Sequence, residues 1–398
     1  MSKTALWVCL LMGLAVACTQ FGSSKARRLH QEAFVFDAHI HMINRQFHHG
    51  GDIADRLSTG QVDLPRLKEG GVDAFLFSLF VPEEYYPPRF ETRHTLRLMD
   101  LALEQISRHQ ALVQIAFSAS DIEAINRQGK MAVILDLEGG FDLDGDPAIL
   151  RSLYRLGLRV AQLPAHNWAS EFADSCCAPP KWNGLNERGR VLVKEMNRIG
   201  MLINLSHASD ETMEQTIDLS SDPVVATHHG LRSLVDIPRN IPDRLLKKLA
   251  AKGGVIGFHL GSEFHSRAFF EWRTRRRGRT FWDTTAVGDR EKNLSITAID
   301  KRVAPRFPMV GQAAPEAIKI SVEEWVGVVD RAIQLVGEDH VALGSDLDGG
   351  PTLPRGMRDA RDLPMLTEAM LDRGYSEQRI RKVLGENLLR VFRHVTER

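Results

Sequence analysis

Histidine and carboxylate side chains, the types that bind metal ions, recur in short motifs along the sequence. His39 and His41 flank one apolar residue, so in an extended segment both imidazoles point the same way. Glu138 precedes Gly-Gly, and a carboxylate can bridge two cations, which an imidazole cannot. Two further histidines, His207 and His228, occur later in the sequence and could also bind metal. Together these side chains predict a site in which two metal ions hold a hydroxide and polarise a carbonyl group.

Three further residues have side chains suited to act on a substrate. Asp346 can accept a proton from the attacking water and return it to a leaving amine. His166 can stabilise an oxyanion, and Arg239 offers a planar fork for a substrate carboxylate. The alternatives are a helix cap or a third metal contact for Asp346, and a loop salt bridge for Arg239. Asp348 competes for the proton-transfer role but is expected to shape its loop, and His229 is expected to be structural.

Each metal-binding motif also has a simpler interpretation. An isolated His-x-His pair often caps or hydrogen-bonds backbone, and a Glu before Gly-Gly can be a turn residue. His207 can cap the helix that follows it. The metal site is favoured because the motifs occur in order at the ends of predicted strands.

Eight short apolar runs alternate with amphipathic segments along the chain. Continuous apolar runs are typical of buried parallel strands, and their alternation with helices favours crossover connections. Eight such units predict a (β/α)₈ TIM barrel, in which the active site lies at the carboxyl ends of the strands. We expect strands at Phe34–Asp37, Ala74–Leu79, Met131–Leu137, Val160–Leu163, Leu202–Leu205, Val224–Thr227, Val255–Phe258 and Val341–Gly344. We expect helices at Thr92–Arg108, Asp121–Gln128, Pro147–Leu156, Glu187–Ile199, Asp210–Leu219, Pro242–Ala251 and Val322–Val336.

The bulk composition is that of a soluble globular enzyme. The chain has 398 residues, 43% of them hydrophobic and 26% charged, and its formal net charge is zero. A neutral chain offers no overall field for nucleic acid, so we predict no nucleic-acid binding. An insertion at about 261–315, after the seventh strand, contains an arginine-rich segment. It is expected to form a lid or wall over the site, with a solvated charged excursion or a homodimer contact as alternatives.

The first residues differ from the rest of the chain. Residues 1–17 combine a positive start, a short apolar run and small residues at the end, which predicts a signal peptide and export. Cys18 follows these small residues, as in a lipoprotein processing site, and lipid attachment there would anchor the protein to a membrane of the cell envelope. We expect one barrel domain over residues 30–398.

Two more cysteines, Cys176 and Cys177, are adjacent in the sequence. Adjacent cysteines rarely bridge one another because disulfide geometry is demanding. We therefore expect two unpaired loop cysteines without a role.

The sequence resembles the renal (membrane) dipeptidase family of zinc metallopeptidases over nearly all of its mature length. The resemblance includes the motifs above and segments without obvious chemistry, namely 63–71, 153–159, 195–200 and 385–392. It implies a two-zinc barrel that hydrolyses dipeptides, with D-residues tolerated on the C-terminal side. The roles that it implies are one metal on His39, His41 and Glu138, the other on Glu138, His207 and His228, substrate contacts from His166 and Arg239, and proton transfer by Asp346.

One position departs from the family pattern. The family usually has His-x-Asp after the first strand, whereas His41 here completes His-x-His. The change removes a negative charge, so it weakens the first metal site, raises the Lewis acidity of its ion or favours another metal. Two alternatives to a dipeptidase therefore stay open. One is an amidohydrolase that acts on cyclic amides, lactones or phosphoesters, and the other is a catalytically silent barrel that binds a peptide.

Overall fold

The computed structural model describes residues 24–82, 86, 90–277, 293–307, 310–311 and 313–397. The predicted signal peptide, Cys18 and residues 278–292 of the predicted insertion lie outside these ranges. Within them, no helix has the length and apolar character needed to cross a bilayer.

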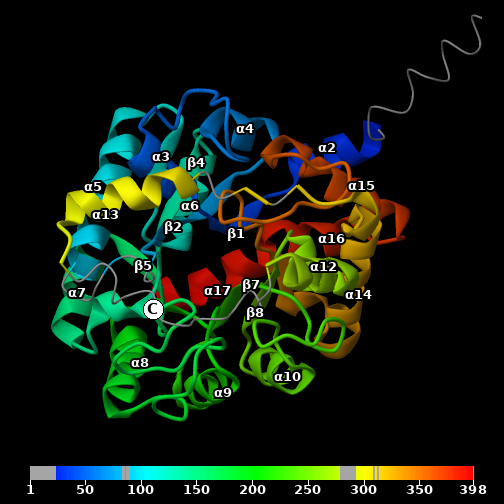
Figure 1. The fold of residues 1–398 in the computed structure, drawn as a ribbon. Helices are drawn as coiled ribbons and strands as arrows, with labels where there is room; N and C mark the ends of the chain where they lie inside the picture. The colour runs from blue at the N-terminus through cyan, green and yellow to red at the C-terminus, as the bar shows by residue number, and fades with distance from the viewer. Residues whose placement is uncertain are drawn as a thin grey trace, which may run out of the picture.

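Eight parallel strands form the barrel, in the order β1-β2-β4-β5-β6-β7-β8-β9 (Figure 1). Every ladder between neighbours is parallel, and the helices between the strands cover the outside, so the predicted (β/α)₈ TIM barrel is confirmed. The strands are β1 (Phe36–Ile40), β2 (Ala74–Phe80), β4 (Met131–Glu138), β5 (Leu158–Gln162), β6 (Leu202–Asn204), β7 (Val225–His229), β8 (Val255–Phe258) and β9 (Val341–Leu343).

The barrel closes where the chain beyond β9 meets β1. Ile40 forms a parallel bridge with Leu347, and the His41 N–H donates to the Leu347 carbonyl at 2.9 Å. The residue before Leu347 also bonds to β1, because the Asp346 N–H donates to the His39 carbonyl at 3.0 Å. These closing bonds bring Asp346 beside the His-x-His motif, although the two are far apart in the sequence.

The helices begin and end close to the positions that the sequence predicts. Those at Glu187–Ile199, Asp210–Leu219 and Val322–Val336 have the predicted bounds, because a side-chain cap fixes each start. The predicted helices are α5 (Glu91–Arg108), α6 (Ala119–Asn126), α7 (Pro147–Arg155), α8 (Glu187–Ile199), α9 (Asp210–Leu219), α10 (Asp243–Ala251) and α14 (Val322–Val336). The others are α2 (Ser24–Glu32), α3 (Met42–His49), α4 (Leu64–Glu69), α11 (Ser262–His265), α12 (Arg267–Arg277), α13 (Ile296–Val303), α15 (Pro364–Asp372), α16 (Glu377–Arg381) and α17 (Asn387–Thr396).

Several strands extend further than predicted. β1 extends to Ile40 and so contains His39, β4 contains Glu138, and β7 contains His228. These three polar side chains face one another inside the barrel, so the strands continue through them. A ninth strand, β3 (Val113–Ile115), was not predicted. It pairs in parallel with the start of β4, and three residues carry too little pattern to be recognised in the sequence.

The described parts of the insertion make contacts with one another and with the rest of the chain. Arg273, part of the arginine-rich segment, is only 7% exposed, and its guanidinium lies 3.2 Å from Glu263 of α11. On α13, Asp300 accepts hydrogen bonds from Tyr86 at 2.7 Å and from Arg97 of α5 at 2.8 Å. Buried ion pairs and hydrogen bonds thus hold Arg273 and α13, whereas the Arg275 side chain on α12 is 72% exposed. In Figure 1, α13 lies beside α5.

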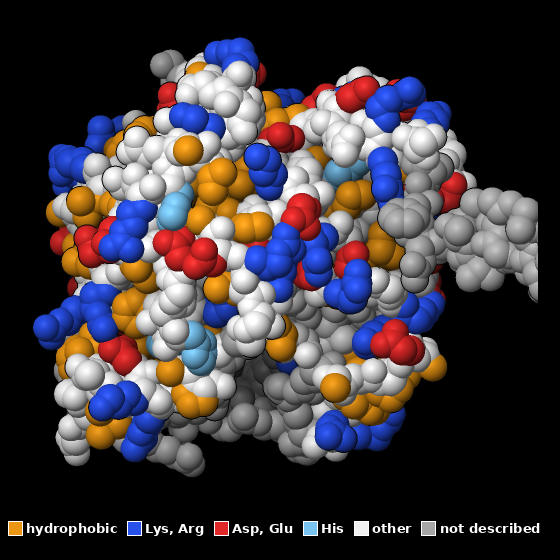
Figure 2. All heavy atoms as spheres, turned by 90° about the horizontal axis from the view of Figure 1, so that it is seen from above, with side chains coloured by type: hydrophobic (Ala, Val, Ile, Leu, Met, Phe, Trp, Pro, Cys, Tyr) orange, Lys and Arg blue, Asp and Glu red, His pale blue; other side chains and the backbone are white. Residues whose placement is uncertain are grey.

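Charges of both signs are interspersed on the surface. In the view of Figure 2, basic and acidic side chains are scattered among hydrophobic ones. This distribution agrees with the zero net charge of the chain.

The barrel interior leaves no room for a side chain at Gly257 of β8. A Cβ atom there would lie 2.1 Å from the Thr227 carbonyl oxygen of β7 and 3.4 Å from the Ala38 Cβ of β1. Gly327 on α14 is different, because apart from the neighbouring backbone of its own helix no described atom lies within 4 Å of a Cβ built there.

We expect Gly257→Ala to destabilise the fold by about 1–3 kcal/mol, as overpacking of a closed interior does. Gly327→Ala is the matched control, and it should stabilise the fold by about 0.5–1 kcal/mol because alanine favours the helix. Thermal unfolding followed by circular dichroism checks both. Equal melting temperatures for the two variants would contradict the packing argument.

Candidate metal centre and substrate site

The Glu138 carboxylate lies at the centre of a cluster of four imidazoles. Its Oε2 atom is 3.1 Å from His39 Nε2 and 3.0 Å from His41 Nε2. Its Oε1 atom is 3.0 Å from His207 Nε2 and 3.7 Å from His228 Nε2. Each oxygen of one carboxylate thus faces its own pair of imidazoles. The structure brings together all five residues that the sequence predicts as metal ligands.

Four strands position this cluster. His39 and Glu138 lie on β1 and β4, His228 lies on β7, and His207 follows β6 by three residues. His207 has a φ of 66°, in the left-handed region that non-glycine residues seldom adopt. His166, Asp346 and Asp348 also have positive φ, at 52°, 60° and 63°. Such conformations cluster at functional sites, where the surrounding structure holds them in place.

Partners on the outer side orient the imidazoles. His39 Nδ1 lies 3.2 Å from the Asp136 carboxylate, and His207 Nδ1 lies 3.1 Å from the Asn167 Oδ1 atom. Both partner atoms are acceptors, so each Nδ1 carries a proton and each Nε2 is the nitrogen that is directed at the cluster. This arrangement is typical of metal-binding histidines.

The electrostatics of the cluster also suit a cation. Burial lowers the pKa of His207 and His228 well below the ordinary value, which keeps both imidazoles neutral. Burial is the largest influence on His39 and His41 and opposes their charged forms, but Glu138, together with Asp136 beside His39 and Asp346 beside His41, raises their pKa to about 10 and about 9. The same imidazoles hold the pKa of Glu138 well below its usual range, against the effect of burial. Binding of a cation would release the protons on His39 and His41.

Three groups of side chains in the described ranges have ligand atoms within 4.8 Å of one another. All are mixtures of imidazole nitrogen and carboxylate oxygen, a donor set that fits zinc and similar divalent ions. The groups are His39–His41–Glu138, His39–His228–Asp346 and Glu138–His166–His207.

Asp346 links the cluster to β8. Its Oδ1 atom is 3.0 Å from His41 Nε2, and its Oδ2 atom is 2.8 Å from His259 Nε2. Both histidines, His259 first, lower the pKa of Asp346 despite its burial, so it is a carboxylate. Asp348 faces away and forms an ion pair with Arg45 at 3.0 Å, which agrees with the expected role in shaping the loop.

His259 is a site residue that the sequence reasoning missed. It directly follows β8, at the same place relative to its strand as the predicted ligands, and that position was the available signal. The Gly261 N–H donates to His259 Nδ1 at 2.5 Å, so Nε2 carries the proton and donates it to Asp346. The His259 carbonyl accepts from the Trp325 indole at 3.0 Å. The ring is therefore fixed, and it fixes the Asp346 carboxylate in turn.

His166 lies at the edge of the cluster. Its Nε2 atom is 3.8 Å from Glu138 Oε1, and its ring centroid is 4.0 Å from that of His207. With 20% of its side chain exposed, it is more accessible than the four buried imidazoles.

Arg239 is a buried cation that faces the site. It is 1% exposed, and its three guanidinium nitrogens make no hydrogen bond within the described structure. The alternative of a loop salt bridge is therefore not observed in the described ranges. Burial lowers its pKa to about 10, against the attraction of Glu138 and Asp346, so it stays charged at neutral pH. An unpaired buried guanidinium is costly unless an anion binds to it.

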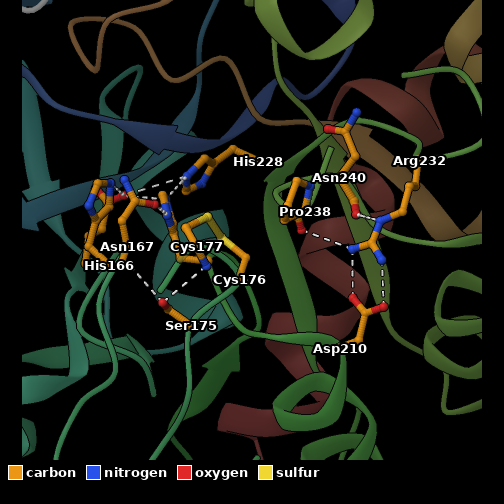
Figure 3. The surroundings of a disulfide bond; sticks show 12 residues. His166, Asn167, Ser175, Cys176, Cys177, Asp210, His228, Arg232, Pro238 and Asn240 are labelled. Carbon is orange, nitrogen blue, oxygen red and sulfur yellow. Dashed lines mark hydrogen bonds and ion pairs between the residues drawn. A yellow bond between two sulfur atoms is a disulfide. The ribbon is translucent and has the colours of Figure 1, made fainter. Parts of the chain in front are cut away.

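The loop that carries Arg239 is held rigidly. Arg232 forms a two-point ion pair with Asp210, at 2.6 and 2.7 Å, and donates to the Asn240 carbonyl at 2.9 Å (Figure 3). The Asn240 side chain in turn donates to the Phe264 carbonyl at 2.9 Å. The guanidinium of Arg239 is thus presented from a fixed backbone.

Cys176 and Cys177 form a disulfide, so the expectation of two unpaired cysteines was wrong (Figure 3). The reason is the loop around them. The Asp174 carboxylate accepts N–H groups of Lys181 at 2.7 Å and of Gly184 at 2.9 Å, and the Cys176 N–H donates to the His207 carbonyl at 2.8 Å. A backbone fixed in this way holds the two sulfurs together, which sequence spacing does not reveal.

Imidazoles and shared carboxylates at the carboxyl ends of the strands of a parallel barrel define a metal-dependent hydrolase. Comparison with known proteins gives the family. The model of the membrane dipeptidase family (peptidase family M19) matches residues 23–398. The chain belongs to this family and is a metal-dependent dipeptidase, as the sequence predicted.

Individual relatives agree with this assignment. Dipeptidase tcpJ of Claviceps purpurea is 31% identical over 346 residues, which are 85% of this chain and 70% of that one. The probable dipeptidase PvdM of Pseudomonas aeruginosa shares the fold, with a TM-score of 0.77 at 22% identity over 94% of this chain and 98% of that one. A metallo peptidase of Rhodobacter sphaeroides, liganded with a phosphinate mimic of the dipeptide L-Ala-D-Ala, has a TM-score of 0.71 at 25% identity, over 91% and 99% of the two chains.

We expect His259→Leu to lower kcat by about 10- to 100-fold while KM and metal content stay near wild type, because only the orientation of Asp346 is lost. His259→Gln keeps a donor and should recover part of the activity. Steady-state kinetics and elemental analysis provide the measurements. The control is His394→Leu, which changes an exposed histidine on α17. Loss of metal in His259→Leu would show that His259 supports the metal centre instead.

Proposed function

We propose that this chain hydrolyses dipeptides with two divalent ions, most simply Zn²⁺, held by His39, His41, Glu138, His207 and His228. The observation that carries the proposal is the Glu138 carboxylate, each of whose oxygens faces a separate pair of imidazoles. A carboxylate in that position is suited to bridge two cations. When bound, such ions activate water and polarise the carbonyl group of the scissile bond.

The protein's own side chains would then bind the substrate and move the proton. Arg239 binds the C-terminal carboxylate of the dipeptide, since it is a buried guanidinium that faces the site. Asp346 accepts a proton from the attacking water and delivers it to the leaving amine, while His259 keeps its carboxylate oriented. His166 stabilises the negative charge that develops on the carbonyl oxygen.

His41 replaces the aspartate that is usual in the family, but two neighbouring carboxylates still supply negative charge to the site. Its Nε2 atom lies 3.0 Å from both Glu138 and Asp346, so two carboxylates flank the imidazole. This arrangement supports binding of a divalent ion at the first position. Zinc is proposed because it accepts mixed nitrogen and oxygen ligands.

The substrate proposal extends to D-residues at the C-terminal position. It is supported by the Rhodobacter sphaeroides relative, whose ligand mimics L-Ala-D-Ala. We further propose export by a signal peptide at residues 1–17, with Cys18 as a lipid attachment site. Two observations support export: the family match begins after this segment, at residue 23, and a disulfide persists in oxidising compartments.

We expect Glu138→Gln to lose metal and activity together, because the neutral amide bridges two cations poorly. Elemental analysis should give about two ions per wild-type chain, mainly zinc, and well under one in the variant. Chelation of the wild-type protein should abolish hydrolysis of Ala-Gly, and added zinc should restore it. Glu211→Gln on α9 is the control for an exposed glutamate. An active, metal-replete Glu138→Gln protein would remove this residue from the centre.

We expect Arg239→Lys to raise KM for dipeptides on the order of tenfold or more, because the two-point contact with the carboxylate is lost. Dipeptide amides, which lack that carboxylate, should be poor substrates of the wild type and change little in the variant. The kinetics of matched acids and amides test this directly. Equal effects on both would show that Arg239 does not bind the carboxylate.

A further inference from the structure

The Cys176–Cys177 disulfide adjoins the metal centre on one side. The Cys176 N–H donates to the His207 carbonyl at 2.8 Å, and Ser175, the preceding residue, donates to the Asn167 carbonyl at 2.8 Å. Asn167 is also the residue whose side chain contacts His207 Nδ1. The bridge is therefore fixed relative to a proposed metal ligand through both its backbone and its neighbour.

On its other side the bridge lies next to the loop that carries Arg239, the residue proposed to bind the substrate carboxylate. Cys177 packs against a small hydrophobic cluster of Val235, Ile237 and Phe264. Val235 and Ile237 belong to the loop that carries Arg239. The Phe264 ring lies 4.0 Å from the His259 ring and 5.6 Å from the Arg239 guanidinium carbon. We name the two cysteines with these three side chains the disulfide wall. It extends from His207 to Arg239.

The chemistry of this wall is apolar and rigid. Bridged sulfurs have no S–H donor, and sulfur is polarisable, so the pair behaves as a hydrophobic surface. Both cysteines are only partly buried. Pockets for small ligands are largely apolar, with a few polar groups that fix the orientation. Arg239 supplies such a polar group at one end of the wall.

We propose that the disulfide wall determines specificity, by contacting the side chain of the C-terminal residue of the dipeptide and favouring apolar residues there. This inference rests on the proposed function, because Arg239 places the C-terminal carboxylate beside the wall. Cleavage of the bridge would let both cysteine side chains rotate, and the apolar surface would lose its fixed shape.

The test compares the double variant Cys176→Ser/Cys177→Ser with the wild type on Ala-Gly, Ala-Ala, Ala-Leu and Ala-Phe. We expect the ratio of kcat/KM for Ala-Leu over Ala-Gly to fall on the order of tenfold, the effect of a degraded hydrophobic pocket. The change should appear in KM, with metal content retained. A non-thiol phosphine reductant should have the same effect on the wild type and none on the double variant. Val191→Ala, an exposed apolar residue on α8, is the matched control.

The outcomes are distinguishable. Equal changes for all four dipeptides, or no change, would overturn the inference, and so would loss of metal, which would assign the bridge to positioning His207. Alkylation followed by mass spectrometry must find free thiols at Cys176 and Cys177 only after reduction, and thiols that are free at these two positions before reduction would also overturn it. Failure of the proposed function would appear differently, as absence of turnover of every dipeptide by the wild-type protein.

Discussion

The structure depends on one buried carboxylate that faces four imidazoles. Glu138 is 2% exposed, and an isolated charge at such a position would be expensive. Its two oxygens divide the imidazoles into two pairs, one from β1 and the residue after it, the other from the ends of β6 and β7. The strands must therefore close into a barrel, because closure brings the imidazoles that compensate the buried charge of Glu138.

Closure of the barrel also positions Asp346, the residue proposed to transfer the proton. The bonds between the chain after β9 and the end of β1 place Asp346 against His41. A shift of one residue in this register would turn Asp346 away from the centre, since neighbouring side chains on an extended chain point to opposite sides. The glycine in β8 beside Thr227 allows the strands to approach closely enough for closure.

Neighbouring side chains fix the orientation of the residues proposed to bind metal and to transfer the proton. Asp136 and Asn167 fix the imidazoles of His39 and His207, and His259 fixes Asp346. The loops add the buried guanidinium of Arg239 and the disulfide beside it. In barrels of this class the strands supply the reactive centre and the loops set what is admitted to it. His41, the position at which this chain departs from the pattern of the resembled family, lies in the reactive centre.

The sequence by itself determined the fold class, because strand and helix periodicities are local and recur eight times. It also indicated the polar residues at the strand ends and, through the family resemblance, the reaction. Only the tertiary structure decided which atoms meet. His259 and Asp346 are 87 residues apart, and their contact depends on the pairing of β8 with β9. The Cys176–Cys177 bridge likewise depends on a loop fixed by Asp174 and His207. Local patterns carry no information about such contacts, because long-range geometry arises only when the barrel closes.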